Sequence, residues 1–250
     1  MNLKKNIFVN SDCYKAGRKI TPRGIMVHST GAKNPWLKRY ISPNDGLLGE
    51  NTGNNHWNRS GVSACVHAFI GKLSDGSVAT YQTLPWNHRG WHAASGKNGS
   101  ANNTHISFEI CEDGLTDSAY FNAVYKEAAE LCAYLCKEYG LTEKDIICHS
   151  EGYKLGIASN HADVMHWFPK HGKSMDTLRV DVKALLVEPE SVQTGQYNTL
   201  SEVPDWAQPT IGKLMEKGLL KGDQNGRLLL DDTMLRILVI NDRAGIYDRE

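Results

Sequence analysis

Histidine is the residue type in this chain that most clearly suggests chemistry. The sequence has 10 histidines among 250 residues, and several stand at the end of an apolar run or in stretches rich in Gly, Ser and Asn. Imidazole nitrogens bind zinc and exchange protons near neutral pH. This uneven placement favours a metal or catalytic site, although a single loop histidine is more often exposed and idle.

Two of these histidines directly follow short apolar runs. His28 follows Ile25-Met26-Val27, and His149 follows the run that ends at Cys148. Such runs predict buried strands, so both imidazoles are expected at strand ends. Histidines placed at strand ends in this way favour a metal or catalytic site.

A glutamate stands in the middle of another expected strand. Glu109 alternates with apolar Phe108 and Ile110, so its side chain is expected on the opposite face of the sheet from theirs. A carboxylate that points from a central strand into a groove needs a functional explanation. Serine and cysteine catalysis are disfavoured, because no Gly-x-Ser-x-Gly motif is present and alternation turns Cys148 away from His149.

The surrounding elements indicate an α/β domain with a mixed β-sheet flanked by helices. A long loop is expected from Pro35 to about Gly61. The expected strands cover 25–27, 64–70, 77–84, 105–111 and 145–148, and the expected helices cover 117–139 and 175–186. Asp75-Gly76 predicts a hairpin turn, and a polar loop is expected after His149.

The sequence predicts two domains. Residues 1–187 are expected to form the catalytic domain, 188–200 a linker rich in turn-forming and polar residues, and 201–250 a small helical unit. In that unit the helical spacing includes Trp206, Ile211 and Leu214, and a second helix is expected to begin near Met234.

The composition indicates which classes of partner are disfavoured and which cellular compartment is expected. Lys+Arg and Asp+Glu both number 28, so the net charge is zero, and neither a nucleic acid nor a membrane surface is favoured as a partner. No apolar segment has the roughly 20 residues that a membrane span needs, and no secretory signal is visible. We therefore expect no membrane insertion, a cytoplasmic protein until release, and reduced cysteines.

Five ordered segments resemble the superfamily of N-acetylmuramoyl-L-alanine amidases and peptidoglycan recognition proteins. They are MVHST, CVHAFIGKLSDGSVATYQTLPW, GWHAASG, HISFEICEDG and ICHSEG to SNHADVMHWF, and they span about residues 18–187. The strongest likeness is to lysins (endolysins) of phages and prophages of Gram-positive bacteria. The resemblance implies a mixed sheet with one zinc ion in a groove, an enzyme that cuts the amide between N-acetylmuramic acid and L-alanine, and peptidoglycan as the partner.

The resemblance also implies the metal ligands. His28 stands in the family's His-x-Thr pattern, His149 matches the second ligand, and Asp163 matches the third. Val164 and Met165 follow Asp163, whereas the family usually has Pro-Gly at these positions. His161 and His166 therefore stay open as alternative third ligands.

Four further residues receive roles from the resemblance. Glu109 matches the general base, with Glu112 as a rival. His161 stands where the family usually has Lys or Thr, and it would stabilise the oxyanion. Trp91 and His92 match a loop that borders the substrate groove, so both are expected to bind substrate.

The C-terminal unit resembles part of an S-layer-homology repeat, on residues such as Trp206, Lys217-Gly218 and Arg236. The resemblance implies attachment to the cell wall; the alternative is a docking module that makes the protein a homo-oligomer. For the whole chain, the alternatives to a wall-directed lysin are a non-catalytic peptidoglycan-binding module and a cytosolic amidase that recycles anhydromuropeptides.

Overall fold

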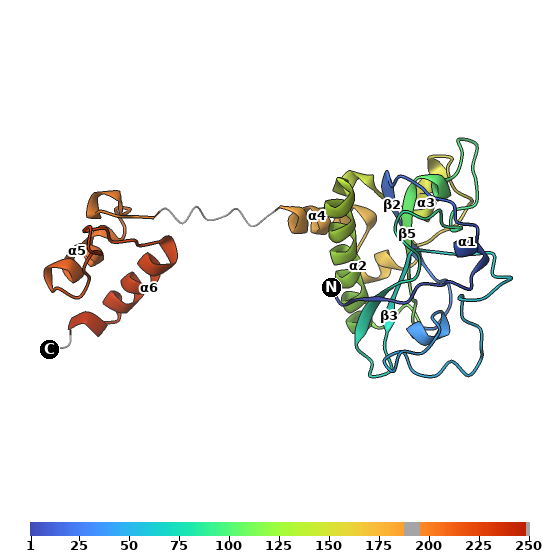
Figure 1. Cartoon of the computed structure of the whole chain (residues 1–250), viewed down its shortest axis with the longest axis horizontal. Helices are drawn as coiled ribbons and strands as arrows, with labels where there is room; N and C mark the ends of the chain where they lie inside the picture. Colours follow the sequence, from blue (N-terminus) through green and yellow to red (C-terminus); the bar gives the residue numbers. More distant parts are fainter. Residues whose placement is uncertain (188–195, 249–250) are drawn as a thin grey trace. The chain divides into compact units, whose positions relative to one another are not determined.

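The computed structural model describes residues 1–187 and 196–248, which form two compact units, Met1–Leu186 and Val187–Glu250 (Figure 1). Residues 188–195 of the expected linker lie outside the described part. The last part of the expected linker belongs to the second unit, because Tyr197 pairs with Leu230 and a 3-10 helix, η5, covers Leu200–Glu202.

A six-stranded mixed sheet forms the centre of the first unit. Its order is β1-β4-β3-β5-β2-β6, and β3 and β4 form an antiparallel hairpin while the other neighbours run parallel. The strands are β1 Leu3–Lys5, β2 Gly24–Ser29, β3 Ala68–Lys72, β4 Val78–Gln82, β5 His105–Ile110 and β6 Ile146–Cys148. This topology confirms the predicted α/β fold with a mixed sheet and a central strand at β5.

Helices flank the sheet in the first unit and make up most of the second. The α-helices are α1 Asp12–Lys15, α2 Ser118–Tyr139, α3 His149–Lys154, α4 Met175–Leu186, α5 Gln208–Glu216 and α6 Asp232–Arg243. The longest, α2, begins where Asp117 accepts a hydrogen bond from the Tyr120 N–H and ends at Gly140 with a φ of 65°. Both ends of α2 agree with the helix predicted from the sequence over residues 117–139.

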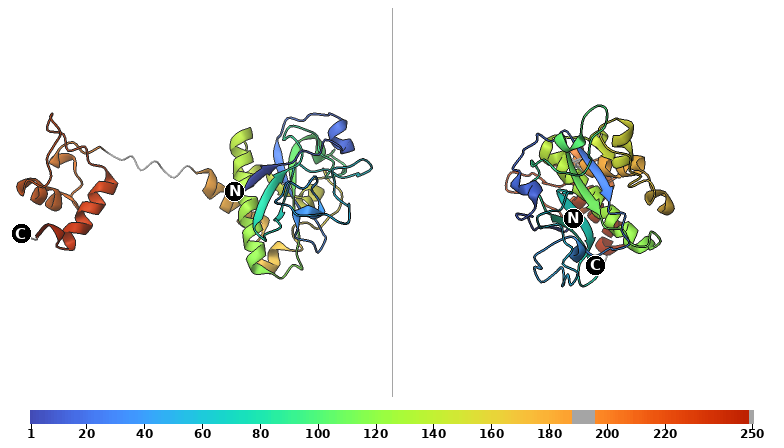
Figure 2. Two further views of the ribbon diagram at one scale, coloured as in Figure 1. Left: turned by 60° about the horizontal axis from the view of Figure 1, so that its bottom comes forward. Right: turned by 90° about the vertical axis from the view of Figure 1, so that its right-hand side faces the viewer.

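Helices α2 and α4 cover one face of the sheet (Figure 2). The buried cluster beneath them includes Ile25 and Val27 from β2 and Phe108 and Ile110 from β5. Side chains alternate along a strand, so the intervening residues of β2 and β5 face the other way. That second face carries the polar side chains of the candidate site.

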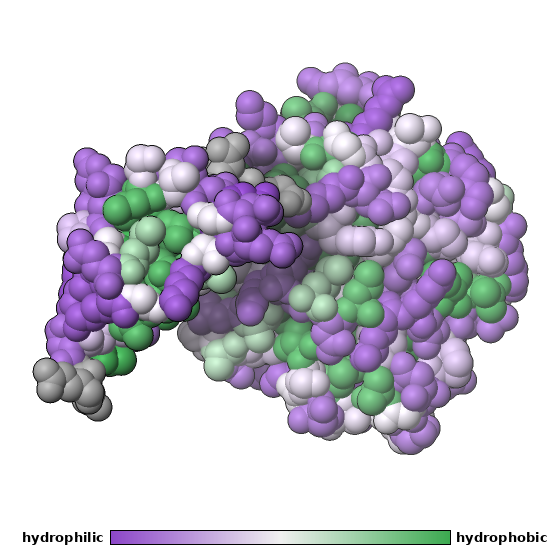
Figure 3. All heavy atoms as spheres, turned by 60° about the vertical axis from the view of Figure 1, so that its left-hand side comes forward, coloured by the Kyte–Doolittle hydropathy of each residue, from purple (hydrophilic) through white to green (hydrophobic). Residues whose placement is uncertain are grey.

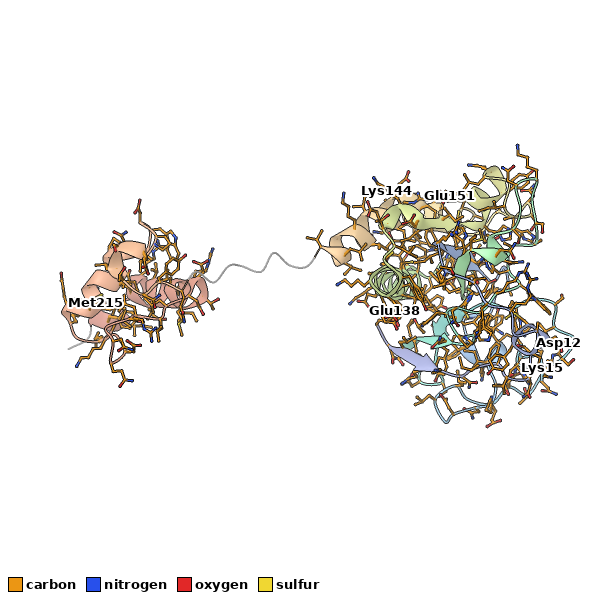
Figure 4. The ribbon with its side chains drawn as sticks, turned by 45° about the horizontal axis from the view of Figure 1, so that its top comes forward. Asp12, Lys15, Glu138, Lys144, Glu151 and Met215 are labelled. Carbon is orange, nitrogen blue, oxygen red and sulfur yellow. The ribbon has the colours of Figure 1, made fainter. Side chains whose placement is uncertain are left out.

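The long loop between β2 and β3 covers part of the second face. Leu37, Tyr40 and Leu48 pack with Phe69 of β3 and Tyr81 of β4 in a second buried cluster. The loop contains one 3-10 turn, η1, Leu37–Arg39. At the loop's far end, Asp12 of α1 accepts hydrogen bonds from Ser60 Oγ and the Gly61 N–H; Figure 4 labels Asp12. The apolar part of the loop thus lies over β3 and β4 rather than over β2 and β5.

Three features differ from the sequence-based expectations. The regular part of β3 begins at Ala68 rather than at residue 64, β1 and α1 were not expected, and α3 replaces the polar loop after His149. Helix α3 has few apolar residues, but its start is stabilised by Glu151, whose carboxylate accepts from the Cys148 N–H at 3.0 Å and pairs with Arg179 at 2.5 Å (Figure 4 labels Glu151). Elements of three to six residues are too short for periodicity to reveal them.

The second unit has a core of its own. Val203, Ile211, Leu230, Leu235 and Val239 are among its buried residues.

In the part of the chain that the structure describes, no helix is both long and apolar enough to span a bilayer.

A fully buried histidine joins three segments of the first unit. His67 precedes β3; its Nε2 hydrogen-bonds the His88 carbonyl at 2.8 Å, and its Nδ1 accepts from the Ser107 N–H at 3.0 Å. This bonding pattern requires a neutral ring. Burial is the main cause that lowers the pKa of His67 to about 4.

We predict that acid weakens the first unit through His67. The pKa of His67 is higher in the unfolded chain than in the folded one, so the unfolded chain takes up a proton first as the pH falls. The contribution of His67 to stability is therefore complete above about pH 6.5 and is lost as the pH falls toward 4. The loss between pH 7 and pH 5 should be roughly 2 kcal/mol of unfolding free energy. Urea denaturation at both pH values measures it. His67→Gln should be less stable at pH 7 yet lose less on acidification; parallel losses in the two proteins would contradict the assignment.

Candidate functional site

Three side chains from separate elements converge on the open face of the sheet. His28 comes from β2, His149 from the first residue of α3, and Asp163 from the loop beyond α3. One ligand atom from each lies within 4.8 Å of the other two. His28 Nδ1 lies 3.0 Å from Asp163 Oδ2 and 3.2 Å from His149 Nδ1, and His149 Nδ1 lies 3.8 Å from the same carboxylate oxygen.

These distances match the donor set of a tetrahedral metal site. Zinc bonds of 2.0–2.2 Å place neighbouring ligand atoms about 3.3 Å apart at tetrahedral angles. The three separations scatter around that value, and the donors are two nitrogens and one carboxylate oxygen. The chemistry and spacing of the set therefore fit a divalent zinc ion.

The outer nitrogens of both histidines also have partners. His28 Nε2 lies 3.0 Å from His92 Nδ1, and His149 Nε2 lies 3.2 Å from Ser159 Oγ. Partners at the outer nitrogen fix the ring's orientation and leave Nδ1 free to bind a metal. Asn102 in turn holds the His92 main chain, because its Oδ1 accepts from the His92 N–H at 2.8 Å. His92 therefore lines the groove and also contacts the outer nitrogen of His28.

Glu109 lies next to this trio because of strand register. Within the parallel pair of β2 and β5, Glu109 is the partner of His28. Glu109 Oε2 is buried and makes no hydrogen bond to any described residue. Burial first, and then the negative charges of Asp163 and Glu112, raise the pKa of Glu109 well above its usual value. A cation nearby would act in the opposite direction.

The electrostatics of the trio favour a neutral His149 and an ionised Asp163. Burial and the proximity of His28 lower the pKa of His149 to about 4. Burial alone would raise the pKa of Asp163, but the hydrogen bond and charge of His28, with His149, make the net shift downward. Neutral nitrogens and a carboxylate are the forms that bind metal.

A groove of about 700 Å³ runs over the trio. Its lining combines the three convergent side chains and Glu109 with polar residues from the surrounding loops. The lining residues outside the trio include Thr30, Ser63, Arg89, Trp91, His92, Glu109, Ser159, His161 and His166. The groove is therefore large enough for part of an extended substrate, with the convergent donors in its wall.

The two alternative third ligands lie elsewhere in the groove. His161 is exposed, and its ring centroid lies 4.6 Å from that of His149 in a tilted arrangement, but it does not join the three convergent donors. His166 Nε2 lies 2.8 Å from Glu112 Oε1, and that same oxygen accepts from the Gly31 N–H. Glu112, the rival base, thus has partners of its own. The structure brings only Asp163 of the three candidates to the two histidines.

Sequence reasoning missed several residues of the site. Ser159 begins the segment SNHADVMHWF, Arg89 directly precedes GWHAASG, and Asn102 lies in a 3-10 helix, η2, Ala101–Asn103. Each contributes one side chain to the wall or its support, but no motif distinguishes it as a site residue. Their side chains are brought to the groove by the loop between β4 and β5 and by the segment after α3. No spacing in the sequence indicates that these loops meet, so no local signal was available.

Comparison with known proteins adds an independent line of evidence. The sequence model of the family described as N-acetylmuramoyl-L-alanine amidase matches residues 17–167. The Bacillus subtilis N-acetylmuramoyl-L-alanine amidase CwlH is 35% identical over 157 residues, which is 60% of this chain and 53% of CwlH. XlyA, an N-acetylmuramoyl-L-alanine amidase of the same organism, is 39% identical over 98 residues, which is 36% of this chain and 32% of XlyA.

These alignments cover about half or less of the curated relatives' length. Among solved structures, PlyL superposes with a TM-score of 0.50 at 18% identity, over 73% of this chain and 96% of that one. This likeness supports the shared fold of the first unit.

Proposed function

We propose, from the premise that this chain belongs to the N-acetylmuramoyl-L-alanine amidase family, that it hydrolyses the amide between N-acetylmuramic acid and L-alanine in peptidoglycan. The observation that carries the proposal is the convergence of His28, His149 and Asp163 beside Glu109 in one groove. A non-catalytic peptidoglycan-binding module would not need such a donor set.

We propose zinc as the cofactor, held by His28 Nδ1, His149 Nδ1 and Asp163 Oδ2. Zinc would supply Lewis acidity, which polarises a carbonyl and makes a water molecule easier to deprotonate. His92 and Ser159 would keep the two imidazoles oriented through their outer nitrogens.

Glu109 would act as the general base and then as the general acid. Its carboxylate takes a proton from the attacking water as the oxygen bonds to the lactyl carbonyl carbon, and it gives that proton to the L-alanine nitrogen as the C–N bond breaks. The unpartnered, buried Oε2 supports this role, because no structural hydrogen bond occupies it. His161, exposed at the groove, would stabilise the oxyanion, and Trp91 would offer its face to the substrate.

The second unit leads us to favour a wall-directed lysin over an enzyme that recycles soluble fragments. Its surface carries exposed apolar side chains, among them Trp206, Met234 and Ile240. Figure 3 shows hydrophobic residues, in green, between hydrophilic ones on the surface of this unit. A pocket of about 290 Å³ beside Trp206 is lined also by Arg236 and Arg243. An aromatic face with flanking donors suits a wall polymer, and the apolar side chains suit a second copy of the chain.

We predict that the purified protein carries about one zinc ion per chain. Asp163→Asn should lower both the zinc content and the activity, because a neutral amide is a weaker ligand than a carboxylate. His166→Ala should keep the metal, since that ring pairs with Glu112. Elemental analysis measures the occupancy. If Asp163→Asn keeps its zinc while His161→Ala or His166→Ala loses it, the third ligand is a histidine.

We predict that Glu109→Gln separates chemistry from metal binding. Glutamine keeps the size of the side chain but cannot take the proton, so turnover should fall about 100-fold or more while the zinc content stays at the parent level. Release of L-alanine amino groups from purified walls, without new reducing sugars, measures the reaction. Full activity in Glu109→Gln together with loss in Glu112→Gln would assign the base to Glu112.

We predict that removing the residues after 187 leaves an enzyme that cleaves soluble muropeptides but lyses intact cells less well. The expected reason is loss of wall attachment, because the first unit has its own core and the complete groove. Sedimentation with purified walls compares the two chains. Equal wall binding by both would contradict the assignment, and a change from dimer to monomer would identify the second unit as a docking module.

A further inference from the structure

Two buried thiols lie together beside the wall of the groove. All six cysteines of the chain are free and buried, and two of them, Cys13 of α1 and Cys65 before β3, pack in one cluster with Leu84. The Cys65 thiol has the Cys13 thiol as a hydrogen-bond partner, and Cys13 Sγ in turn donates to the Arg89 carbonyl at 3.4 Å. Two thiols in direct contact can become bonded with a small shift of their side chains.

Hydrogen bonds also hold the two cysteine-bearing segments side by side. The Asn10 N–H donates to Asn58 Oδ1 at 3.0 Å. Asp12 accepts from Ser60 Oγ and from the Gly61 N–H, each at 2.8 Å. The contact between the thiols therefore continues a longer contact between two segments of the chain, and these hydrogen bonds keep the sulfur atoms close.

Cys65 belongs at the same time to the wall of the groove. Its N–H donates to the Trp91 carbonyl at 3.0 Å, and its carbonyl accepts from the Trp91 N–H at 2.9 Å. Ser63 and Trp91 both line the groove. A covalent bond at Cys65 would therefore anchor one wall of the groove to α1.

Helix α1 offers an oxidant a route to the thiols. The hydrogen bond with Cys13, together with burial, raises the pKa of the Cys65 thiol, so the packed pair reacts slowly. Helix α1 has only four residues, between Asp12 and Lys15, which Figure 4 labels. A single helical turn opens locally at lower cost than the 22-residue α2, which carries two other cysteines. The thiol of α1 is therefore easier for an oxidant to reach than those of α2.

We propose that Cys13 and Cys65 form a disulfide bond when the protein meets a low-molecular-weight disulfide, and that this bond clamps α1 to the wall of the groove. One protein thiolate attacks a sulfur of the oxidant, whose S–S bond breaks and releases one thiol. The second protein thiolate attacks the mixed disulfide, forms the bond between the two cysteines and releases a second thiol. The two thiol protons of the protein end on the released thiols, and two electrons pass to the oxidant.

The bond should stabilise the first unit. It closes a loop of about 50 residues, which reduces the conformational entropy of the unfolded chain. The cell wall lies outside the reducing cytoplasm, where disulfides persist. Exposure to the oxidant thus rests on the proposed function, whereas the thiol pair itself does not.

The test incubates the full-length protein with oxidised glutathione and compares it with the reduced protein. The intact mass should fall by about 2 Da without a glutathione adduct, because the released thiols leave the protein. A tryptic digest without reductant should contain one linked pair of peptides, which joins Cys13 to Cys65. The melting temperature of the first unit should rise by about 5–15 °C, and dithiothreitol should reverse all three changes.

Single substitutions identify the bond. Cys13→Ala and Cys65→Ala should each lose the linked peptides and the rise in melting temperature. Cys132→Ala removes a buried thiol of α2 and should keep both, so it is the matched control. If a variant fails to fold, the peptide map of the parent protein still decides.

Three outcomes would overturn the proposal: no loss of mass in the parent, a linked pair that contains other cysteines, or a stable glutathione adduct on either thiol. A bond between Cys13 and Cys65 without a rise in melting temperature would overturn the clamp. None of these measurements uses the cleavage of peptidoglycan. A failed amidase assay therefore leaves the disulfide standing, and a missing disulfide leaves the amidase assignment untouched.

Discussion

The parallel pairing of β2 with β5 is the constraint on which the site depends. Its register makes His28 and Glu109 direct partners, and alternation along each strand sends both side chains to the face opposite α2. The same alternation sends Val27 and Phe108 into the core beneath that helix. A shift by one residue would exchange the two sets, burying the polar side chains under α2 and exposing the core, so hydrophobic burial fixes the geometry of the candidate centre.

The face of the sheet opposite α2 has two parts, one covered by the long loop and one that forms the groove. The loop between β2 and β3 packs its apolar residues on Phe69 of β3 and Tyr81 of β4, while the groove lies over β2 and β5. Around the convergent donors, a set of uncharged partners, His92, Ser159 and Asn102, orients rings rather than neutralising charge. The site therefore has a rigid floor of strands and a support made from loops.

Much of this arrangement could be predicted from sequence, and the limits are physical. The 22-residue helix α2 has strong periodicity and both caps, and its bounds are confirmed. Strand alternation in β5 predicted the face of Glu109 correctly. Elements as short as β1 and α3 carry no period of their own. The contacts of Ser159 with His149 and of Asn102 with His92 depend on local backbone conformations that no spacing in the sequence reveals. Asp163, His161 and His166 lie within six residues, so only coordinates show which of the three side chains lies beside both His28 and His149.

The sequence separation of the three donors has a consequence for how the site comes into being. His28 is 121 residues from His149 and 135 residues from Asp163, and the strands and helix that join them close the first unit. Closing such long loops costs chain entropy that only the finished sheet and its core can offset. No early, local fragment of the chain can therefore hold the three groups together. The complete donor set therefore requires the assembled sheet, which makes metal binding by all three groups a reporter of the folded domain.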